Sequence, residues 1–343
     1  DSFPKMTNVL HLIDHAGFGG AQRLVQGIIS AYGNHYALIL RQSKHHMSLP
    51  GAIRCTSKSR WSLAPFFLAS IVIKQKHIGI VHCHLIRSLF FGCLLKCRFP
   101  HIKLIYHEHG AIQQKGLWYR VMLWIASLWV HRFIAVSPNI SQQLNLTHIP
   151  KKKITTIANF IALTPVSKIK HKGCVVGFVG RLTKVKGIDL FLKAFSLLSP
   201  SYHALIVGSG PLEKAMKHYC KKQQISSRVT FVGFREDLAP EYAKMDIYVN
   251  TSRSESFGLS IIEAQRCGIP VVCPWLPAIR HLIHDGKDGL LYPCGNSTML
   301  VQCIEELNDS KRRSSLITAG KQNASQYTLQ QFMQQLEVVY HSY

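Results

Sequence analysis

The 343-residue chain is poor in acidic side chains. It contains 17 aspartates and glutamates against 41 lysines and arginines, which gives a formal net charge of +24. The deficit is largest in the first half, because residues 1–170 hold 21 basic residues and only three acidic ones, Asp1, Asp14 and Glu108. A half this basic indicates a polyanionic partner, either an anionic membrane surface or a nucleic acid.

Recognisable metal and redox motifs are missing as well. The ten cysteines include no C-x-x-C pair and no metal-ligand spacing with histidine, so we expect reduced thiols in a cytoplasmic protein. Two H-x-H pairs, His82 with His84 and His107 with His109, have no cluster of carboxylates beside them, so we expect a polar pocket wall there and no metal. The first five residues also lack the pattern of a secretory leader.

No apolar run reaches the roughly 20 residues that a membrane-spanning helix needs. The most hydrophobic stretch, residues 117–130, contains Arg120 and is bounded by Lys115 and His131. We interpret this stretch as a helix buried in the core. The alternative is an interfacial helix with tryptophan and arginine side chains at the level of the lipid head groups.

The length of the chain favours two domains, each with its own core. In both halves short apolar segments alternate with helical patterns, an order typical of parallel sheets covered by helices on both faces. The segments expected to form strands are 9–13, 36–40, 78–82, 103–107, 133–136 and 154–157 in the first half, and 174–179, 204–207, 229–232, 247–250 and 271–273 in the second. The basic segment 164–172 is interpreted as the linker between the halves.

In parallel sheets ligands bind beyond the carboxyl ends of the strands, so the turns there are candidate site elements. Gly19 and Gly20 form such a turn before a helix, where glycine lets a ligand approach the backbone closely. His109, beside Gly110 after the strand at 103–107, is the side chain best placed to touch a substrate.

Two strand ends of the second half carry groups that suit a diphosphate. Arg181 and Lys186 flank a turn that begins at Gly180, and two cations at a strand end neutralise a diphosphate. The next strand is followed by Gly208 and Gly210, in a second glycine-rich turn.

Residues 252–265 predict a loop that enters a short helix. The backbone N–H groups around Phe257 and Gly258 would lie at the positive end of the helix dipole, which is a seat for a phosphate. Glu255 precedes this seat and Glu263 follows it, so the two carboxylates suit the hydroxyl groups on either side of the phosphates of a nucleotide sugar. The alternative is a solvated helix with two incidental surface acids.

Taken in order, these motifs resemble those of the retaining family 4 glycosyltransferases, which have the GT-B fold. The motifs that carry the resemblance are G-R-x4-K-G at 180–187, G-x-G-P at 208–211, F-V-G at 231–233, E-x-F-G-L-x3-E-A at 255–264, G-x-P-V-V at 268–272 and D-G-x2-G-L-L at 285–291. The first half agrees more loosely, through G-G-A at 19–21, H-x-H at 82–84 and 107–109, A-V-S at 135–137 and I-x-N at 157–159. The resemblance thus covers nearly the whole chain and implies two α/β, Rossmann-like parallel-sheet domains that face each other across a cleft. They are an acceptor-binding domain over 1–165 and a nucleotide-sugar donor domain over 166–327, with a last helix, at 328–343, that packs back on the first.

The resemblance implies a role for each matching position. Arg181 and Lys186 would pair with the donor diphosphate, Glu255 would hold hydroxyls of the donor sugar, and Glu263 would bind the ribose. His109 would meet the sugar and the acceptor, and with Arg181, Lys186 and Glu255 it makes up the implied catalytic set. The further donor-binding positions are Gly19, Gly20, Gly180, Gly208, Gly210, Phe257, Gly258 and Leu259.

The resemblance implies a front-face transfer, in which the leaving phosphate helps to deprotonate the acceptor hydroxyl and the protein contributes positioning and electrostatic stabilisation. The resemblance therefore implies neither a carboxylate nucleophile nor a metal or other cofactor. Two departures from the family pattern stand out. The sequence W-L-P-A at 275–278 replaces the usual Gly-Gly pair and acid near the donor sugar, and Asn159 is followed by Phe160 instead of glycine.

The leading hypothesis is a hexosyltransferase that moves a sugar from a UDP-sugar to a glycan or lipid-linked acceptor in cell-envelope polysaccharide or lipopolysaccharide synthesis. It would dock peripherally, through its basic first half, on the cytoplasmic face of an anionic membrane. A sugar-nucleotide epimerase of the same fold is the alternative. We expect no nucleic-acid partner, since neither an aromatic stacking platform nor a known binding motif accompanies the charge.

Overall fold

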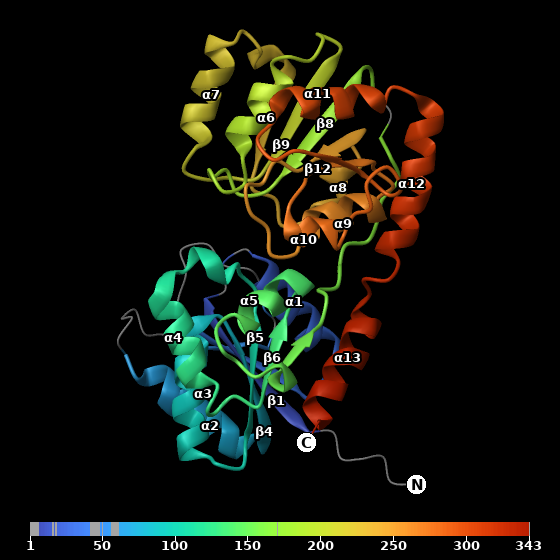
Figure 1. Cartoon of the computed structure of the whole chain (residues 1–343). Helices are drawn as coiled ribbons and strands as arrows, with labels where there is room; N and C mark the ends of the chain where they lie inside the picture. The colour runs from blue at the N-terminus through green and yellow to red at the C-terminus, as the bar shows by residue number, and fades with distance from the viewer. Residues whose placement is uncertain are drawn as a thin grey trace. The chain divides into compact units, whose positions relative to one another are not determined.

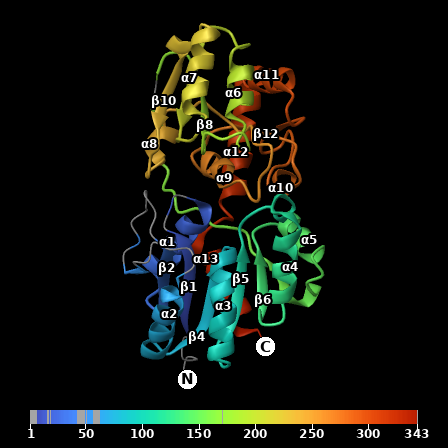
Figure 2. The same ribbon diagram turned by 90° about the vertical axis from the view of Figure 1, so that its left-hand side faces the viewer.

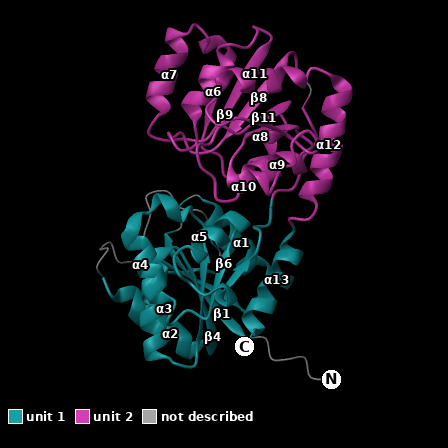
Figure 3. Ribbon diagram, in the orientation of Figure 1, with its two compact units in different colours: residues 1–162, 328–343 teal, residues 163–327 magenta. Residues whose placement is uncertain are grey.

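The computed structural model describes residues 7–15, 17, 19–41, 49, 51–55, 62–169 and 171–342. The chain forms two compact units, residues 1–162 with 328–343 and residues 163–327 (Figure 1, Figure 3). The boundaries predicted from the sequence lie at 165/166 and 327/328. Within the described residues, none of the helices combines the length and the apolar character that crossing a membrane requires.

The first unit is built on a parallel sheet whose seven strands, among the described residues, have the order β3-β2-β1-β4-β5-β6-β7. Its strands are β1 (Asn8–His15), β2 (His35–Arg41), β3 (Ile53–Arg54), β4 (Ile78–His84), β5 (Lys103–Glu108), β6 (Arg132–Ala135) and β7 (Ile154–Thr156). All of these strand pairs are parallel, as the strand and helix alternation predicts.

Helices cover both faces of this sheet. They are α1 (Gly20–Ala31), α2 (Ala64–Gln75), α3 (Ile86–Arg98), α4 (Gly116–Ala126), α5 (Pro138–Asn145) and α13 (Leu329–His341). Figure 2 shows α2, α3 and α4 in front of the sheet and α13 behind it. The C-terminal helix α13 thus belongs to the first unit, where Phe332 and Leu336 share one hydrophobic core cluster with Leu24 and Ile28 of α1.

The sheet face under α13 is lined by alternate residues of neighbouring strands. Val9 and Ile13 of β1, Ile80 of β4 and Ile105 of β5 all belong to the core cluster that contains α13. Because side chains alternate between the two faces of a sheet, the histidines at even steps from these positions point to the same face. They are His11, His82, His84 and His107.

The second unit contains a parallel sheet of the order β10-β9-β8-β11-β12-β13. Its strands are β8 (Cys174–Val179), β9 (Tyr202–Val207), β10 (Val229–Gly233), β11 (Ile247–Val249), β12 (Val271–Pro274) and β13 (Leu290–Tyr292). Its helices are α6 (Ile188–Phe195), α7 (Glu213–Lys222), α8 (Ala239–Tyr242), α9 (Leu259–Arg266), α10 (Pro277–Arg280), α11 (Ser297–Glu306) and α12 (Ser310–Ala324). The two parallel α/β sheets confirm the predicted fold class.

The predicted burial of residues 117–130 is wrong. This stretch forms α4 and the turn after it, and only a minority of its side chains face the core, among them Leu123 and Ala126. Trp118 is 82% exposed and Leu128 is 76% exposed. The sequence pattern misled because large apolar side chains lie on more than one side of this helix, a composition that is typical of a buried helix.

Candidate functional site

The loop after β8, residues 180–187, packs tightly against the loop after β9. Gly208 has a φ of 133°, and a Cβ at this position would overlap the carbonyl oxygen of Gly180. A Cβ on Gly210 would likewise collide with the backbone of Leu182. In the structure these two glycines allow the two loops to pack closely. Their contact with a donor stays a prediction.

The same loop is fixed to the segment that follows β11. Gly187 adopts a φ of 70°, and a Cβ there would overlap the carbonyl oxygen of Thr251. The Thr251 hydroxyl donates to the carbonyl oxygens of Gly187, at 2.8 Å, and of Lys186, at 3.2 Å. Three strand ends of the second unit are therefore held together, and Lys186 is placed over the segment that carries Glu255.

Lys186 and Glu255 form a largely buried ion pair. Lys186 Nζ lies 2.6 Å from Glu255 Oε1, and the two side chains are 27% and 7% exposed. The same oxygen accepts hydrogen bonds from Ser252 Oγ at 2.7 Å and from Asn250 Nδ2 at 3.3 Å. All of these contacts are to Oε1, and Glu255 Oε2 has no hydrogen-bond partner within the described ranges.

Burial raises the pKa of the Glu255 carboxyl, but the charge of Lys186 and the three hydrogen bonds outweigh it and hold the pKa below its usual value. Glu255 is therefore an ionised acceptor with one oxygen still available for a hydroxyl donor.

Arg181 contrasts with Lys186 on the same loop. Its side chain is exposed, and in the part of the chain that the structure describes it has neither an ion-pair nor a hydrogen-bond partner. Arg181 is therefore a cation of this loop that is available to an anion, whereas Lys186 is already paired.

Helix α9 begins directly after the ion pair. Its N-cap is Gly258, at φ 104° and ψ 46°, so a backbone turn in the left-handed region redirects the chain into the helix. Phe257 is buried and packs edge-on against Tyr327 with ring centroids 5.7 Å apart, which fixes the entrance to the helix. The first N–H groups of a helix lack intrahelical partners, so the Leu259 end of α9 is an anion seat of the predicted kind.

Glu263 lies one turn inside α9 and is buried. Its Oε2 accepts a hydrogen bond from Tyr242 Oη, at the end of α8, at 2.9 Å. Tyr242 also donates to the Ser260 carbonyl oxygen at 3.2 Å. The predicted ribose contact of Glu263 stays a prediction, and the structure adds a buried tyrosine that orients this carboxylate.

In the first unit, Gly19 is the N-cap of α1 and Gly20 is its first residue. Gly19 has a φ of −172°, an extended conformation that any residue adopts, and a Cβ there would meet only the side chain of Gln22. Backbone strain therefore does not explain this glycine. The structure places the pair at the carboxyl end of β1, as predicted, and its contact with a diphosphate is not tested.

His109 follows β5, and its ring stacks on that of His107 with the centroids 4.2 Å apart. His109 Nε2 lies 2.9 Å from His84 Nδ1, and burial lowers the pKa of His109 to about 3, with a further lowering from the charge of Lys115. Next to it, Glu108 Oε1 accepts from the Gly110 N–H at 2.9 Å and pairs with Lys115 Nζ at 2.8 Å. His109 is thus a neutral imidazole on a braced loop.

Sequence reasoning did not identify Glu108, His11 or His35. A signal for Glu108 was present, because it is the only acidic residue between Asp14 and Asp189. Glu108 is fully buried and also accepts hydrogen bonds from Tyr106 and Tyr119, so it joins the loop of His109 to the start of α4. The two histidines could be placed only once the register of β1 and β2 was known.

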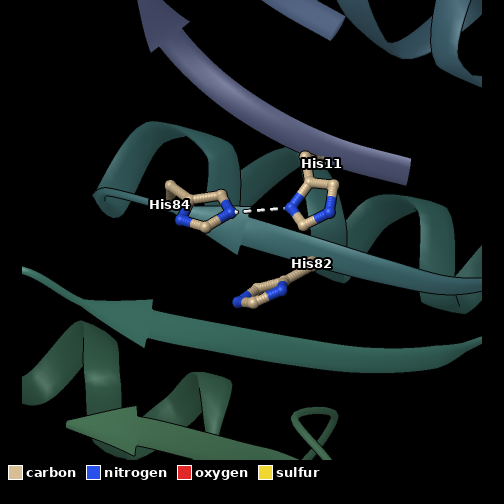
Figure 4. Close-up of side chains that lie close together, drawn as sticks. All are labelled: His11, His82 and His84. Atoms are coloured by element: carbon tan, nitrogen blue, oxygen red, sulfur yellow. Dashed lines mark hydrogen bonds between the residues drawn. The ribbon is translucent and has the colours of Figure 1, made fainter. Parts of the chain in front are cut away.

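Two histidine triads have the spacing of a possible metal site: His11 with His82 and His84, and His84 with His107 and His109. In each triad the nitrogens all lie within 4.8 Å of one another. In each, however, two of the nitrogens already face each other at hydrogen-bond distance, as Figure 4 shows for His11 and His84 at 3.0 Å. The prediction of no metal stays a prediction.

Comparisons with known proteins agree with this architecture. Residues 160–323 match the model for "Glycosyl transferases group 1", and residues 41–164 match the model for "Glycosyltransferase Family 4". Among solved structures, HepE of Anabaena in complex with UDP and glucose superposes with a TM-score of 0.83 at 20% identity, covering 98% of this chain and all of that one. The lipopolysaccharide outer core galactosyltransferase WaaB superposes with a TM-score of 0.75 at 17% identity, covering 98% and 99%.

Curated relatives match part of the chain. An N-acetyl-alpha-D-glucosaminyl L-malate synthase of Bacillus anthracis is 27% identical over 60% of this chain and 58% of its own length. A lipopolysaccharide core biosynthesis mannosyltransferase of Rhizobium meliloti is 27% identical over 49% of this chain and 51% of its own length. The chain thus spans between a half and three fifths of these two relatives. With both halves matched in order and the double parallel-sheet fold in place, the chain belongs to glycosyltransferase family 4 and has the GT-B fold.

Proposed function

We propose that this protein is a retaining hexosyltransferase that moves a sugar from a UDP-sugar to a glycan or lipid-linked hydroxyl in cell-envelope polysaccharide or lipopolysaccharide synthesis. The observation that carries the proposal is the Lys186–Glu255 ion pair just before the N-terminus of α9 in the second unit, on a loop that also carries the exposed Arg181. A neighbour of the same fold solved with UDP and glucose, and a relative that is a lipopolysaccharide core biosynthesis mannosyltransferase, support the choice of donor and pathway class.

In the proposed reaction each group acts on a different part of the donor. Arg181 and the α9 N-terminus take the diphosphate, Glu255 Oε2 accepts a hydrogen bond from a sugar hydroxyl, and Glu263 accepts from the ribose. The bond from the anomeric carbon to the diphosphate breaks while the acceptor oxygen bonds to the same face, and the acceptor proton passes to the leaving diphosphate. The protein contributes positioning and charge stabilisation, and no metal or other cofactor is part of the proposal.

A thermal-shift panel tests the donor. At a hundredfold its Kd a ligand adds about 2.7 kcal/mol of apparent stability, which for a unit of this size corresponds to a rise of roughly 5–10 °C in Tm. We expect this rise with UDP and UDP-hexoses and a much smaller one with ADP- or CMP-sugars. If no nucleotide sugar shifts Tm, the donor assignment is wrong, and if a UDP-sugar is converted to its epimer without acceptor, the protein is the alternative epimerase.

The first unit offers a surface for the membrane part of the proposal. Helix α4 and the turn after it expose Leu117, Trp118, Trp124 and Leu128, each at more than half of its area. The neighbouring helices α2 and α3, which contact one another and α4 in the order α2-α3-α4, add exposed apolar side chains. These are Leu63, Phe67 and Ile71 on the α2 side and Phe90 on α3.

The charge around this surface suits anionic lipid. Between residues 62 and 131 the chain contains eight lysines and arginines and a single acid, Glu108, which is fully buried. Tryptophan and arginine at an interface, combined with a basic surround, favour binding in the head-group layer of an anionic membrane. Since Glu108 ties α4 to the loop of His109, docking by α4 would bring that loop near the lipid surface.

Co-sedimentation with vesicles tests this docking. We expect binding to phosphatidylglycerol vesicles that weakens at high salt and is at least about tenfold weaker in a Trp118→Ser/Trp124→Ser variant, because two large interfacial side chains are lost. Trp275→Ser, which removes an exposed tryptophan of the second unit, is the matched control and should bind as the parent does. If vesicle binding changes neither with salt nor with the double substitution, this surface is not the membrane-docking site.

A further inference from the structure

Six histidines gather on one side of the sheet of the first unit, in the layer between the sheet and α13. They come from five positions on four neighbouring strands and one on the loop after β5: His11, His35, His82, His84, His107 and His109. Five of them are buried to less than a tenth of their area, and His109 is partly buried. Helix α13 closes over them, with Tyr340 Oη 2.7 Å from His82 Nδ1.

Four of the six rings form a continuous hydrogen-bonded chain. His35 Nδ1 lies 2.8 Å from His11 Nε2, His11 Nδ1 lies 3.0 Å from His84 Nε2, and His84 Nδ1 lies 2.9 Å from His109 Nε2. Every link thus joins the Nδ1 of one ring to the Nε2 of the next. The chain begins at the start of β2 and ends at the carboxyl end of β5.

The rings meet in line. The centroid distances are 5.1 Å for His35 with His11, 5.3 Å for His11 with His84 and 5.2 Å for His84 with His109. In all three pairs the centroids are farther apart than the bonded nitrogens by the same amount, which equals two ring radii. The nitrogens therefore lie between the centroids and point at each other, which is the geometry of a hydrogen bond.

This pattern restricts the positions of the protons. A neutral imidazole has one N–H and one acceptor nitrogen, and each link needs one of each. If His35 donates from Nδ1, then His11, His84 and His109 must each accept at Nε2 and keep their proton on Nδ1. If His109 donates from Nε2, every ring carries its proton on Nε2. The four rings must therefore share one tautomer, and one ring changes tautomer only if all four do.

We propose that His35, His11 and His84 hold His109 in a single ring orientation and a single tautomer, with His84 as the positioning residue in direct contact. The proposal rests on the proposed function only in taking His109 as the ring that meets the sugar or acceptor. His109 Nδ1 is buried and has no hydrogen-bond partner among the described residues, so it is the ring nitrogen that the other imidazoles leave unengaged. Whether it donates or accepts is set by the chain behind it.

15N NMR spectroscopy tests the hydrogen-bonded chain of imidazoles without any assay of sugar transfer. In protein labelled with 15N-histidine, two-bond proton–nitrogen correlations identify the tautomer of each ring, and single substitutions assign the signals. We expect His35, His11, His84 and His109 to show the same neutral tautomer. Two different tautomers among the four rings would overturn the proposal, whatever reaction the protein catalyses.

Two substitutions of His84 show whether its hydrogen bond positions His109 or whether its side chain only fills space in the core. The amide of His84→Asn reaches the place of Nδ1 and keeps a partner for His109, whereas the amide of His84→Gln reaches the place of Nε2 and keeps a partner for His11 only. We expect transfer by His84→Asn within a few fold of the parent, and a fall in kcat of about tenfold to a hundredfold for His84→Gln with the donor KM unchanged.

If the two variants are equally active, or if His84→Gln is the better of the two, the positioning role is wrong. A parent protein without detectable transfer would instead count against the proposed function. The tautomer measurement would still show whether the four imidazoles form the proposed hydrogen-bonded chain.

Discussion

The first unit is expected to lose its structure sharply as the pH falls towards about 5, while the second unit stays folded. Burial lowers the pKa of six histidines of the first unit from the ordinary value of 6.5. For His35 the pKa falls to about 4 and for His109 to about 3. These imidazoles are neutral in the folded unit and become protonated on unfolding.

The direction of this pH dependence follows from the uptake of protons on unfolding. Because the unfolded chain binds more protons than the folded one below about pH 6.5, stability is fully present above that pH and is lost as the pH falls. Each such histidine contributes a slope of about 1.4 kcal/mol per pH unit, so six contribute about 8 kcal/mol per pH unit. The whole stability of a domain is about 5–15 kcal/mol. Asp14 works in the opposite direction, because burial raises its pKa to about 6, but it offsets only one proton of the six.

Hydrogen exchange read by mass spectrometry at about pH 7 and about pH 5 distinguishes the two units in one sample, so the second unit is the internal control. His107→Leu is the matched variant, because neither ring nitrogen of His107 has a hydrogen-bond partner among the described residues. This variant should take up one proton fewer on unfolding. The free energy of unfolding of the first unit should then depend less steeply on pH, by about 1.4 kcal/mol per pH unit. Equal protection of the first unit at the two pH values would contradict this account.

The sequence is sufficient for the parallel sheets because strand and helix alternate throughout and each apolar segment ends in a recognisable turn. It is also sufficient for the parts of the site that are contiguous, such as Glu255 and the Gly258 turn into α9. Both depend on local patterns. Neither needs knowledge of which strands are neighbours.

The remaining features depend on register and on solvent exposure, which single segments do not encode. The imidazole chain needs β2, β1 and β4 to be adjacent with His11 level with His82, and this pairing is a property of the sheet. The exposed side of α4 has the same apolar composition as its buried side, so only the packed structure separates Trp118 from Leu123. The bond from Lys186 to Glu255 joins loops of different strands for the same reason.

The ion pair in the second unit also shows why glycine motifs are an incomplete guide to contacts with a ligand. Gly187 and Gly208 adopt left-handed backbone conformations and lie against neighbouring backbone, so a side chain at either position would move the loop of Arg181 and Lys186. Their effect on a diphosphate would be exerted through the cations that this loop carries. Substitution there is accordingly a poor probe of direct contact, and the charged side chains are the better ones.

Glu255→Gln is expected to reduce kcat/KM for transfer by about a hundredfold to a thousandfold, the size of effect typical of losing one preorganised electrostatic contact. The amide keeps the shape of the carboxylate but loses its charge, so Lys186 is left without a counter-ion and the hydroxyl acceptor at Oε2 is weakened. Lys186→Met should cost a similar amount, and the double variant should be little worse than either, because the two groups act as one unit.

Two further variants make this result specific. Arg181→Ala, which removes an exposed cation without a partner among the described residues, should leave Tm unchanged and weaken the binding of UDP, because its predicted work is on the diphosphate alone. Glu213→Gln breaks the exposed ion pair with Lys217 in α7 and should alter neither binding nor transfer. Steady-state kinetics with a UDP-sugar and calorimetry with UDP measure both quantities. Glu255→Gln with the kinetics of the parent would show that the pair braces the loop and takes no part in holding the donor.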